Sequence, residues 1–86
     1  MAEVLVYRTP YCPYCVRVKH LLEGKGVPFK EIDVSDDPGK RRWLADVTRR
    51  RTVPQVFING KPVGGFDEVA ALNRSGELDR LLAESV

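Results

Sequence analysis

Cysteine and histidine, the usual ligands of structural zinc, are scarce in this chain of 86 residues, which has two cysteines and one histidine. A structural zinc site takes four ligands, usually two cysteine pairs or one pair with two histidines. The composition therefore argues against a self-contained zinc site, and we expect the protein to require no metal.

Long apolar runs are also missing from the sequence. No apolar stretch approaches the roughly 20 residues that cross a bilayer, and residues 1–3 lead into the first apolar segment without the basic start of a secretory signal. Cysteines outside the secretory route stay reduced, so that a disulfide there is transient and catalytic. We therefore expect a cytoplasmic protein without a membrane partner.

A strong charge of one sign is absent too, because the formal net charge is only +2. This value is too small to indicate a nucleic-acid partner. The one basic run, Arg49-Arg50-Arg51, has no interleaved aromatic residues. It is typical of a solvated face or of a contact with a small anion.

Repeats, linkers and low-complexity segments are not found either. The hydrophobic content of 43% and the charged content of 30% are ordinary for a globular protein. The length supports one core and not two, so we expect a single domain over residues 1–86 that acts as a monomer.

The apolar pattern predicts a strand over residues 4–7 that is buried on both faces, a helix over 13–24 and a second strand over 29–34. Either Gly24 or Gly26 is expected to provide the left-handed cap of the helix. A right-handed crossover makes the two strands a parallel pair.

A second helix is predicted after Asp37, which is a capping residue followed by a proline. Its pattern indicates that Trp43, Leu44 and Val47 are buried, with Trp43 serving in packing.

A hairpin is predicted over residues 55–63, because Asn59-Gly60 is the strongest short signal for a tight turn. Pro62 cannot donate to a strand ladder, so its strand should lie at the edge of the sheet.

After the hairpin, Asp67 is expected to cap a helix that begins near Glu68. A closing helix should follow, with an apolar stripe formed by Leu78, Leu81 and Leu82.

The motif Cys12-Pro13-Tyr14-Cys15 joins the first strand to the first helix, which is the usual context of a redox pair. Proline suits the first position of a helix. The partial positive charge of the helix N-terminus favours a thiolate at Cys12. Cys15 would lie one turn further on the same face. A purely structural disulfide would close a very short loop and stabilise little.

The roles of the two cysteines follow from this placement. Cys12 is expected to be the nucleophile, since it lies at the accessible end of the helix. Cys15 is sheltered inside the helix and is expected to be the resolving thiol.

Three motifs together, in this order and spacing, point to a family: the cysteine motif, Thr52-Val53-Pro54 and Gly64-Gly65-Phe66-Asp67. Over essentially its whole length the chain resembles a dithiol glutaredoxin of the bacterial glutaredoxin-3 type. The resemblance implies an α/β, thioredoxin-like fold with a four-stranded mixed sheet of order 2-1-3-4 flanked by helices. It also implies thiol–disulfide exchange with glutathione as co-substrate, acting on glutathionylated proteins and protein disulfides.

The resemblance further implies a glutathione groove. Arg8 and Arg41 match positions that contact the glycyl carboxylate. Asp67 matches the position that meets the γ-glutamyl ammonium, while the backbone of Gly65 and Phe66 approaches the glutamyl carboxylate.

The middle of the groove is implied by the Thr52-Val53-Pro54 motif. The resemblance makes the Val53-Pro54 peptide bond cis, so that the Val53 backbone is offered to the cysteinyl part of glutathione. Tyr14 is expected to line the same groove.

The sequence departs from the family pattern at two positions. Phe66 stands where a cysteine or serine is common, so there is no third thiol. Arg8 stands where a lysine is common, which keeps the charge and adds a planar fork suited to carboxylates.

Two other functions are alternatives to glutathione-dependent thiol–disulfide exchange. A thioredoxin-like redoxin served by a flavin reductase usually carries Ser-Gly-Phe-Arg-Pro where this chain has residues 64–68, a difference that favours glutathione. An iron–sulfur carrier would bridge a cluster between two chains through Cys12 and glutathione. Pro13 and Tyr14 make the site stiffer and bulkier than in the glutaredoxins that do so.

Overall fold

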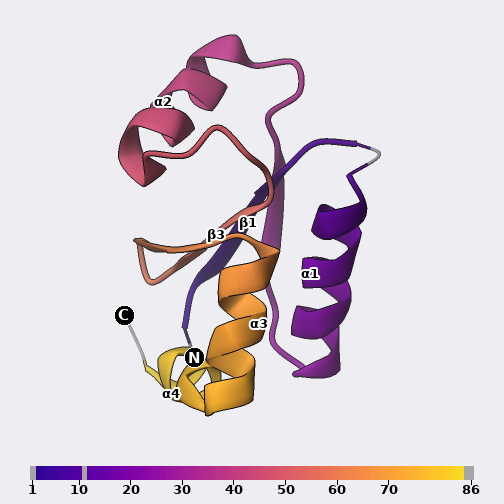
Figure 1. Cartoon of the computed structure of the whole chain (residues 1–86), viewed down its shortest axis with the longest axis vertical. Helices are drawn as coiled ribbons and strands as arrows, with labels where there is room; N and C mark the ends of the chain where they lie inside the picture. Colours follow the sequence, from indigo (N-terminus) through magenta and orange to yellow (C-terminus); the bar gives the residue numbers. More distant parts are fainter. Residues whose placement is uncertain (1, 11, 85–86) are drawn as a thin grey trace.

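The computed structural model describes residues 2–10 and 12–84. The elements are β1 (Val4–Arg8), α1 (Pro13–Gly24), β2 (Lys30–Asp33), α2 (Pro38–Thr48), β3 (Gln55–Ile58), β4 (Lys61–Gly64), α3 (Phe66–Ser75) and α4 (Glu77–Ala83). The strands form one mixed sheet of order β2-β1-β3-β4, with β1 and β2 parallel and the other pairs antiparallel (Figure 1). The parallel pair and the antiparallel hairpin are those that the sequence pattern predicted, and the strand order is the one that the family resemblance implied.

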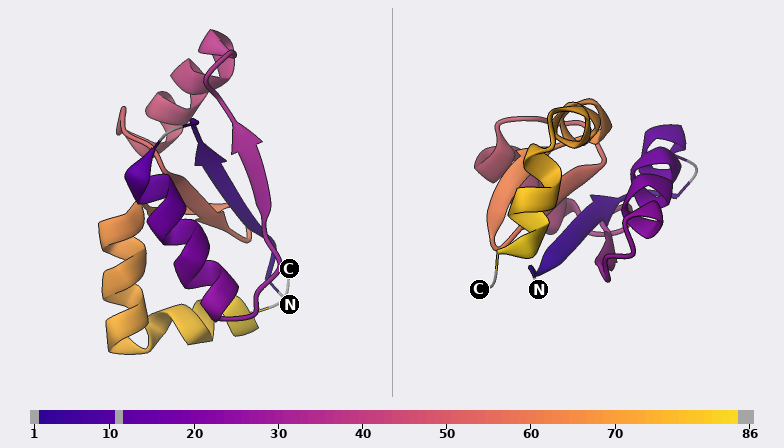
Figure 2. Two further views of the ribbon diagram at one scale, coloured as in Figure 1. Left: turned by 90° about the vertical axis from the view of Figure 1, so that its right-hand side faces the viewer. Right: turned by 90° about the horizontal axis from the view of Figure 1, so that it is seen from below.

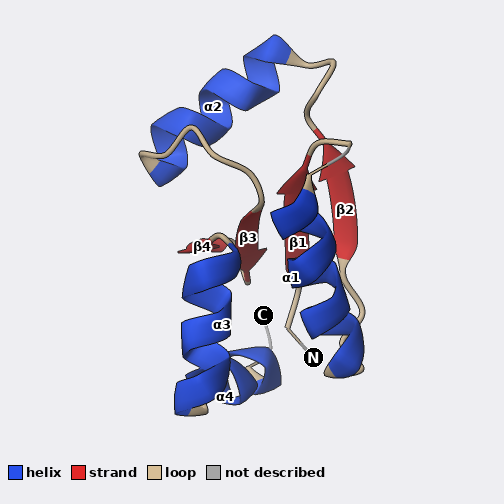
Figure 3. Cartoon of the chain, turned by 45° about the vertical axis from the view of Figure 1, so that its right-hand side comes forward, coloured by secondary structure: helices blue, strands red, loops and turns tan. Residues whose placement is uncertain are grey.

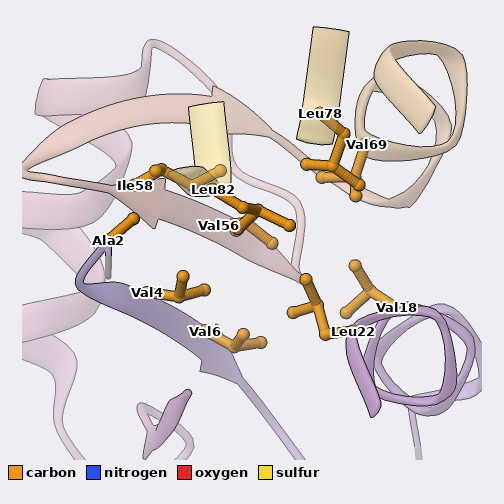
Figure 4. Close-up of a cluster of buried hydrophobic side chains, with 10 residues drawn as sticks. All are labelled: Ala2, Val4, Val6, Val18, Leu22, Val56, Ile58, Val69, Leu78 and Leu82. Carbon is orange, nitrogen blue, oxygen red and sulfur yellow. The ribbon is translucent and has the colours of Figure 1, made fainter. Parts of the chain in front are cut away.

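The larger core lies between one face of the sheet and the helices α1, α3 and α4. Successive residues of a strand point to opposite faces, so Val4 and Val6 of β1 share a face, and Val56 of β3 points to the same one. Figure 2 shows α1 and α3 side by side on the same side of the sheet. The buried side chains of the five elements converge in Figure 4.

A smaller core on the opposite face lies under α2. It contains Tyr7 of β1, Val34, Leu44 of α2 and Phe57 of β3. The loop that leaves α2 runs back to the start of β3 (Figure 3).

The predicted burial of Trp43 and Val47 is wrong, since these residues are 44% and 42% exposed. A single helix over one sheet face buries only a narrow stripe, and here Leu44 occupies it. The Trp43 ring lies at the margin of this core, with its centroid 6.0 Å from that of Phe57 and 5.7 Å from that of Tyr7. The ring packs against two aromatic neighbours and remains partly open to solvent.

Several local predictions are confirmed. Asp37 caps α2 by accepting the Lys40 N–H at Oδ1 over 2.9 Å. Gly26, with φ of 69°, takes the left-handed conformation after α1. Asn59 and Gly60 both have positive φ in the hairpin turn, as this turn type requires.

The predicted start of α3 is wrong by two residues, and Asp67 is not its cap. The helix begins at Phe66 with Gly65 as the N-cap residue. The Glu68 Oε1 atom accepts the Gly65 N–H over 2.8 Å, so the side chain three positions into the helix satisfies a donor that a capping residue leaves free.

A strained residue ends α2. Arg49 has φ of 61° and ψ of 25°, a left-handed conformation that costs a residue with a Cβ atom about 1–2 kcal/mol. Arg49→Gly should therefore raise the free energy of unfolding by about 0.5–1 kcal/mol, after allowing for the greater freedom of glycine in the unfolded chain. Urea denaturation measures the change. Arg49→Ala removes the same charge but keeps the strain, and equal stabilisation by both variants would contradict the explanation.

Candidate functional site

Cys12 lies at the N-terminus of α1 and caps the helix with its own sulfur. Its backbone is extended, and its Sγ atom accepts the Cys15 N–H over 3.2 Å. Pro13 occupies the first helical position, where its missing N–H costs nothing. The sulfur of Cys12 thus takes the place of the oxygen of an ordinary capping side chain.

Cys15 lies one turn further and is only 5% exposed. Burial, followed by a hydrogen bond with Cys12 and with a lesser contribution from the charge on Cys12, raises the pKa of the Cys15 thiol to about 12, while the Thr9 backbone and Arg8 oppose the shift. Both cysteines are free thiols. The Cys15 thiol is therefore both less accessible than Cys12 and harder to ionise than an ordinary thiol.

A loop from a distant part of the chain lies against Cys12. The Cys12 thiol faces the Val53 carbonyl oxygen over 3.7 Å, and the Val53-Pro54 peptide bond is cis. Gly65 lies behind this loop, where an added Cβ would come within 3.0 Å of the Pro54 carbonyl oxygen. The start of α3 can therefore approach the loop closely only because position 65 has no side chain.

Gln55 is a residue of this site that the sequence did not reveal. It is fully buried, and its Nε2 group donates to the Thr52 carbonyl oxygen over 3.0 Å and to Thr52 Oγ1 over 3.3 Å. Its side chain fixes the loop from the side of the sheet. A polar residue at the start of a buried strand was the available signal.

The pair of Arg50 and Glu68 was also missed. The Arg50 Nη1 atom donates to Glu68 Oε1 over 2.6 Å, so one carboxylate oxygen holds both the loop and the Gly65 N–H. The hydrogen bond from Arg50 and then that from Gly65 lower the pKa of Glu68. Asp67 lies next to Glu68 with its side chain exposed in the first turn of α3.

Arg8 and Arg41, both expected near one carboxylate, line separate hollows. Arg8 lines a small hollow of about 230 Å³ together with Cys12 and Cys15, and its Nε lies 2.9 Å from Glu31 Oε1. Arg41 lines a larger hollow of about 960 Å³ along α2. Thr52 and Val53 also line the larger hollow, which thus extends from Arg41 to the loop beside Cys12.

Tyr14 belongs to the first turn of α1, and its ring lies near the start of α3. The Tyr14 side chain is 51% exposed. Its ring centroid lies 6.2 Å from the ring centroid of Phe66, and the Arg17 guanidinium lies 5.3 Å from the Tyr14 centroid. The exposed ring is therefore available on the side of the site where α3 begins.

Within residues 2–10 and 12–84, no group of three or more His, Cys, Asp or Glu side chains is placed to hold a metal ion. Among the helices of the same residues, none has the length and apolar character needed to cross a membrane.

Comparison with known proteins places this arrangement in a family. A scan against protein families matches residues 4–63 to Glutaredoxin. Glutaredoxin-C6 of Oryza sativa subsp. japonica is 51% identical, over 98% of this chain and 78% of its own length. Glutaredoxin 3 of Escherichia coli is 44% identical, over 95% of this chain and 99% of its own length.

Solved structures agree with the sequence matches. The crystal structure of a buckwheat glutaredoxin–glutathione complex superposes with a TM-score of 0.87 at 37% identity, covering 94% of this chain and 76% of the buckwheat chain. With a matching family, close relatives of nearly full coverage and the same thioredoxin-like fold around the cysteine pair, this chain belongs to the glutaredoxin family.

Proposed function

We propose that this glutathione-dependent thiol–disulfide oxidoreductase uses Cys12 as its nucleophile and Cys15 as its resolving thiol. One observation carries the assignment: the Cys12 sulfur accepts a helix N-terminal N–H, while Cys15 is buried and hard to ionise. The positive end of a helix favours a thiolate, and the thiolate is the species that attacks a disulfide.

The first reaction is the reduction of a glutathione mixed disulfide. The Cys12 thiolate attacks the glutathione sulfur, a disulfide between Cys12 and glutathione forms, and the substrate leaves as a thiolate that takes a proton from water. A second glutathione thiolate then attacks the bound glutathione sulfur. Oxidised glutathione leaves, and the Cys12 thiolate is restored.

The second reaction is the reduction of a protein disulfide. Cys12 attacks one sulfur and forms a mixed disulfide with the protein, while the other protein sulfur leaves as a thiolate that takes a proton from water. Cys15 then gives its proton to water and attacks the Cys12 sulfur, so that a Cys12–Cys15 disulfide forms and the second protein thiolate leaves. One glutathione thiolate opens this disulfide at Cys12, a second attacks the bound glutathione sulfur, and oxidised glutathione leaves with both cysteines reduced.

Burial is the main cause that raises the pKa of Cys15, followed by the hydrogen bond with Cys12, and the charge of Cys12 contributes as well. The two causes that involve Cys12 weaken when its sulfur enters a disulfide, so the Cys15 thiol is easier to ionise at the step where it attacks.

The glutathione groove is assigned to the loop beside Cys12 and its two neighbouring surfaces. The Val53 backbone, next to the Cys12 sulfur, would bind the cysteinyl part of glutathione, with Pro54 behind it and Tyr14 at the side. Thr52 and Arg41 line the hollow that leads away from this point and suit the glycyl carboxylate. The glutathione complex of the buckwheat relative supports this use of the fold.

The glutamyl end of glutathione would lie at the start of α3. The exposed Asp67 carboxylate suits the ammonium group, and the positive end of α3 at Phe66 suits the glutamyl carboxylate. The Gly65 N–H is already bound by Glu68, so Gly65 contributes mainly by its lack of a side chain. Arg8, beside both cysteines, contributes positive potential, which its pairing with Glu31 reduces.

The protein substrates would be glutathionylated proteins and protein disulfides, reduced by the chain as a monomer in the cytoplasm. A reducing compartment supplies the glutathione thiol that both reactions consume.

The two cysteine variants separate the two reactions. Cys12→Ser should lose all activity, because a hydroxyl without a general base is not a usable nucleophile. Cys15→Ser should keep the reduction of glutathione mixed disulfides and lose most reduction of protein disulfides, where Cys15 must act at high effective concentration. A glutathione-coupled assay with both substrate types measures this. Turnover of a mixed disulfide by Cys12→Ser would overturn the assignment.

Alkylation should distinguish the two thiols. With a pKa of about 12, the Cys15 thiol is about one part in 10⁵ thiolate at pH 7, so iodoacetamide should label Cys12 alone. Labelling of Cys15 should rise only as the pH approaches its raised pKa or when the protein unfolds in urea. Peptide mapping by mass spectrometry reports each site. Comparable labelling rates in the native protein at pH 7 would rule out the electrostatic difference.

Variants of Asp67 and Glu68 should separate the binding of glutathione from the stability of the fold. Asp67→Asn should raise the KM for glutathione by about 3- to 10-fold, because a charge-assisted contact is weakened in an exposed groove, with no change in thermal stability. Kinetics and thermal melting report the two effects. An unchanged KM for Asp67→Asn would remove the ammonium contact from the proposal.

Glu68→Gln is the matched variant, and it should lose about 1 kcal/mol of stability through the weakened link to Gly65. The pKa of Glu68 is lowered in the folded protein, so its charge stabilises the fold at neutral pH. This contribution is lost as the pH falls from the ordinary pKa of a glutamate side chain through the lowered pKa of Glu68. The difference between wild type and Glu68→Gln should therefore shrink in acid.

A further inference from the structure

The larger hollow of the molecule has an unusual charge. It occupies about 960 Å³ between α2 and the loop that follows it, and we call it the arginine groove. Its charged lining residues are Asp46 and five arginines, Arg41, Arg42, Arg49, Arg50 and Arg51. The lining thus carries a net charge of +4, more than the +2 of the whole chain, so the remainder of the chain is net negative.

Most of this charge is not neutralised within the protein. In the part of the chain that the structure describes, Arg50 is the only one of the five arginines in an ion pair, with Glu68. All five are exposed. Like charges held together repel one another, and such a cluster raises the local concentration of anions and steers them to it.

Glutathione alone does not account for the cluster. It brings two carboxylates and one ammonium group, and the proposed function already places one carboxylate at Arg41 and the other at the start of α3. Arg42, Arg49 and Arg51 are then left over. They lie on the same hollow as Thr52 and Val53, and Val53 is in contact with the Cys12 sulfur.

We propose that the arginine groove docks an acidic segment of the protein substrate, close in sequence to the cysteine whose disulfide is reduced. An extended peptide advances about 3.3 Å per residue, so acidic residues a few positions from that cysteine would lie along α2. Bidentate pairing of guanidinium with carboxylate suits such a segment. The inference rests on the proposed function, and it adds a preference among protein substrates.

A peptide fits the groove better than a single-stranded nucleic acid. Nucleic acids bind to positive grooves that also carry aromatic side chains on which bases stack. Among residues 2–10 and 12–84, those that line the arginine groove include no aromatic side chain.

The test uses three synthetic glutathionylated peptides that differ only in four residues placed three to six positions from the cysteine: all Glu, all Gln or all Lys. The double variant Arg42→Gln/Arg51→Gln removes two charges from the groove and leaves Arg41 and the Arg50–Glu68 pair in place. The control is Lys61→Gln/Arg74→Gln, which removes two exposed charges from β4 and α3. The value of kcat/KM is measured at 50 and at 300 mM NaCl.

Wild type should prefer the acidic peptide over the neutral one by about 10-fold at low salt, and the preference should shrink at high salt because salt screens exposed charges. The groove variant should lose most of this preference and keep its activity on the neutral peptide, whereas the control variant should behave as wild type. Equal rates of wild type on the acidic and neutral peptides would overturn the proposal, and so would an equal loss of the preference in both variants.

Competition by a single-stranded oligonucleotide that is stronger than competition by a free acidic peptide would assign the groove to nucleic acid instead. Inactivity of wild type on the neutral peptide would remove the proposed function, and this inference with it.

Discussion

Tyr7 pairs with Gln55 in the antiparallel contact between β1 and β3, and the position of the active groups follows from this register. The end of β1 leads to the Cys12 motif, and the start of β3 follows directly on the Val53-Pro54 loop. Pairing these two strand ends brings a segment near residue 12 against one near residue 53. The buried Gln55 side chain then holds Thr52, so the register also determines the shape of the loop. A slip of one residue would turn these side chains to the other face of the sheet.

Charged and polar groups on either side of the Val53-Pro54 loop differ in their surroundings. The Cys12 sulfur accepts an N–H at a helix N-terminus, while Cys15, one turn away, is held neutral by burial and by Cys12 itself. Identical side chains thus lie in different electrostatic surroundings because of position alone. At the other side of the loop, the Glu68 carboxylate joins Arg50 to the Gly65 N–H. This link ties the segment after α2 to the start of α3, the two surfaces between which glutathione is proposed to lie.

The elements governed by local chemistry could be predicted from the sequence. The Asp37 cap and the Asn59-Gly60 turn depend on neighbouring residues, and the structure contains both. The burial of Trp43 could not be predicted, because helical spacing does not tell how wide a stripe the sheet will cover. Asp67 is not the cap because Gly65 occupies the N-cap position, and the carboxylate of Glu68, three residues further on, accepts the Gly65 N–H. The contacts of Gln55 and of Arg50 depend on tertiary packing, whereas the cysteine pair is readable because its chemistry and its helix position coincide.

The two edges of the sheet have a bearing on how the protein behaves at high concentration. An exposed edge strand offers unpaired N–H and C=O groups to other chains and can template aggregation. β4 is one edge, is four residues long and contains Pro62, which has no N–H to offer. β2 is the other edge, is equally short and has three charged residues among its four. Neither edge invites a further strand, so the fold resists intermolecular sheet growth even though one of its faces is covered by a single helix.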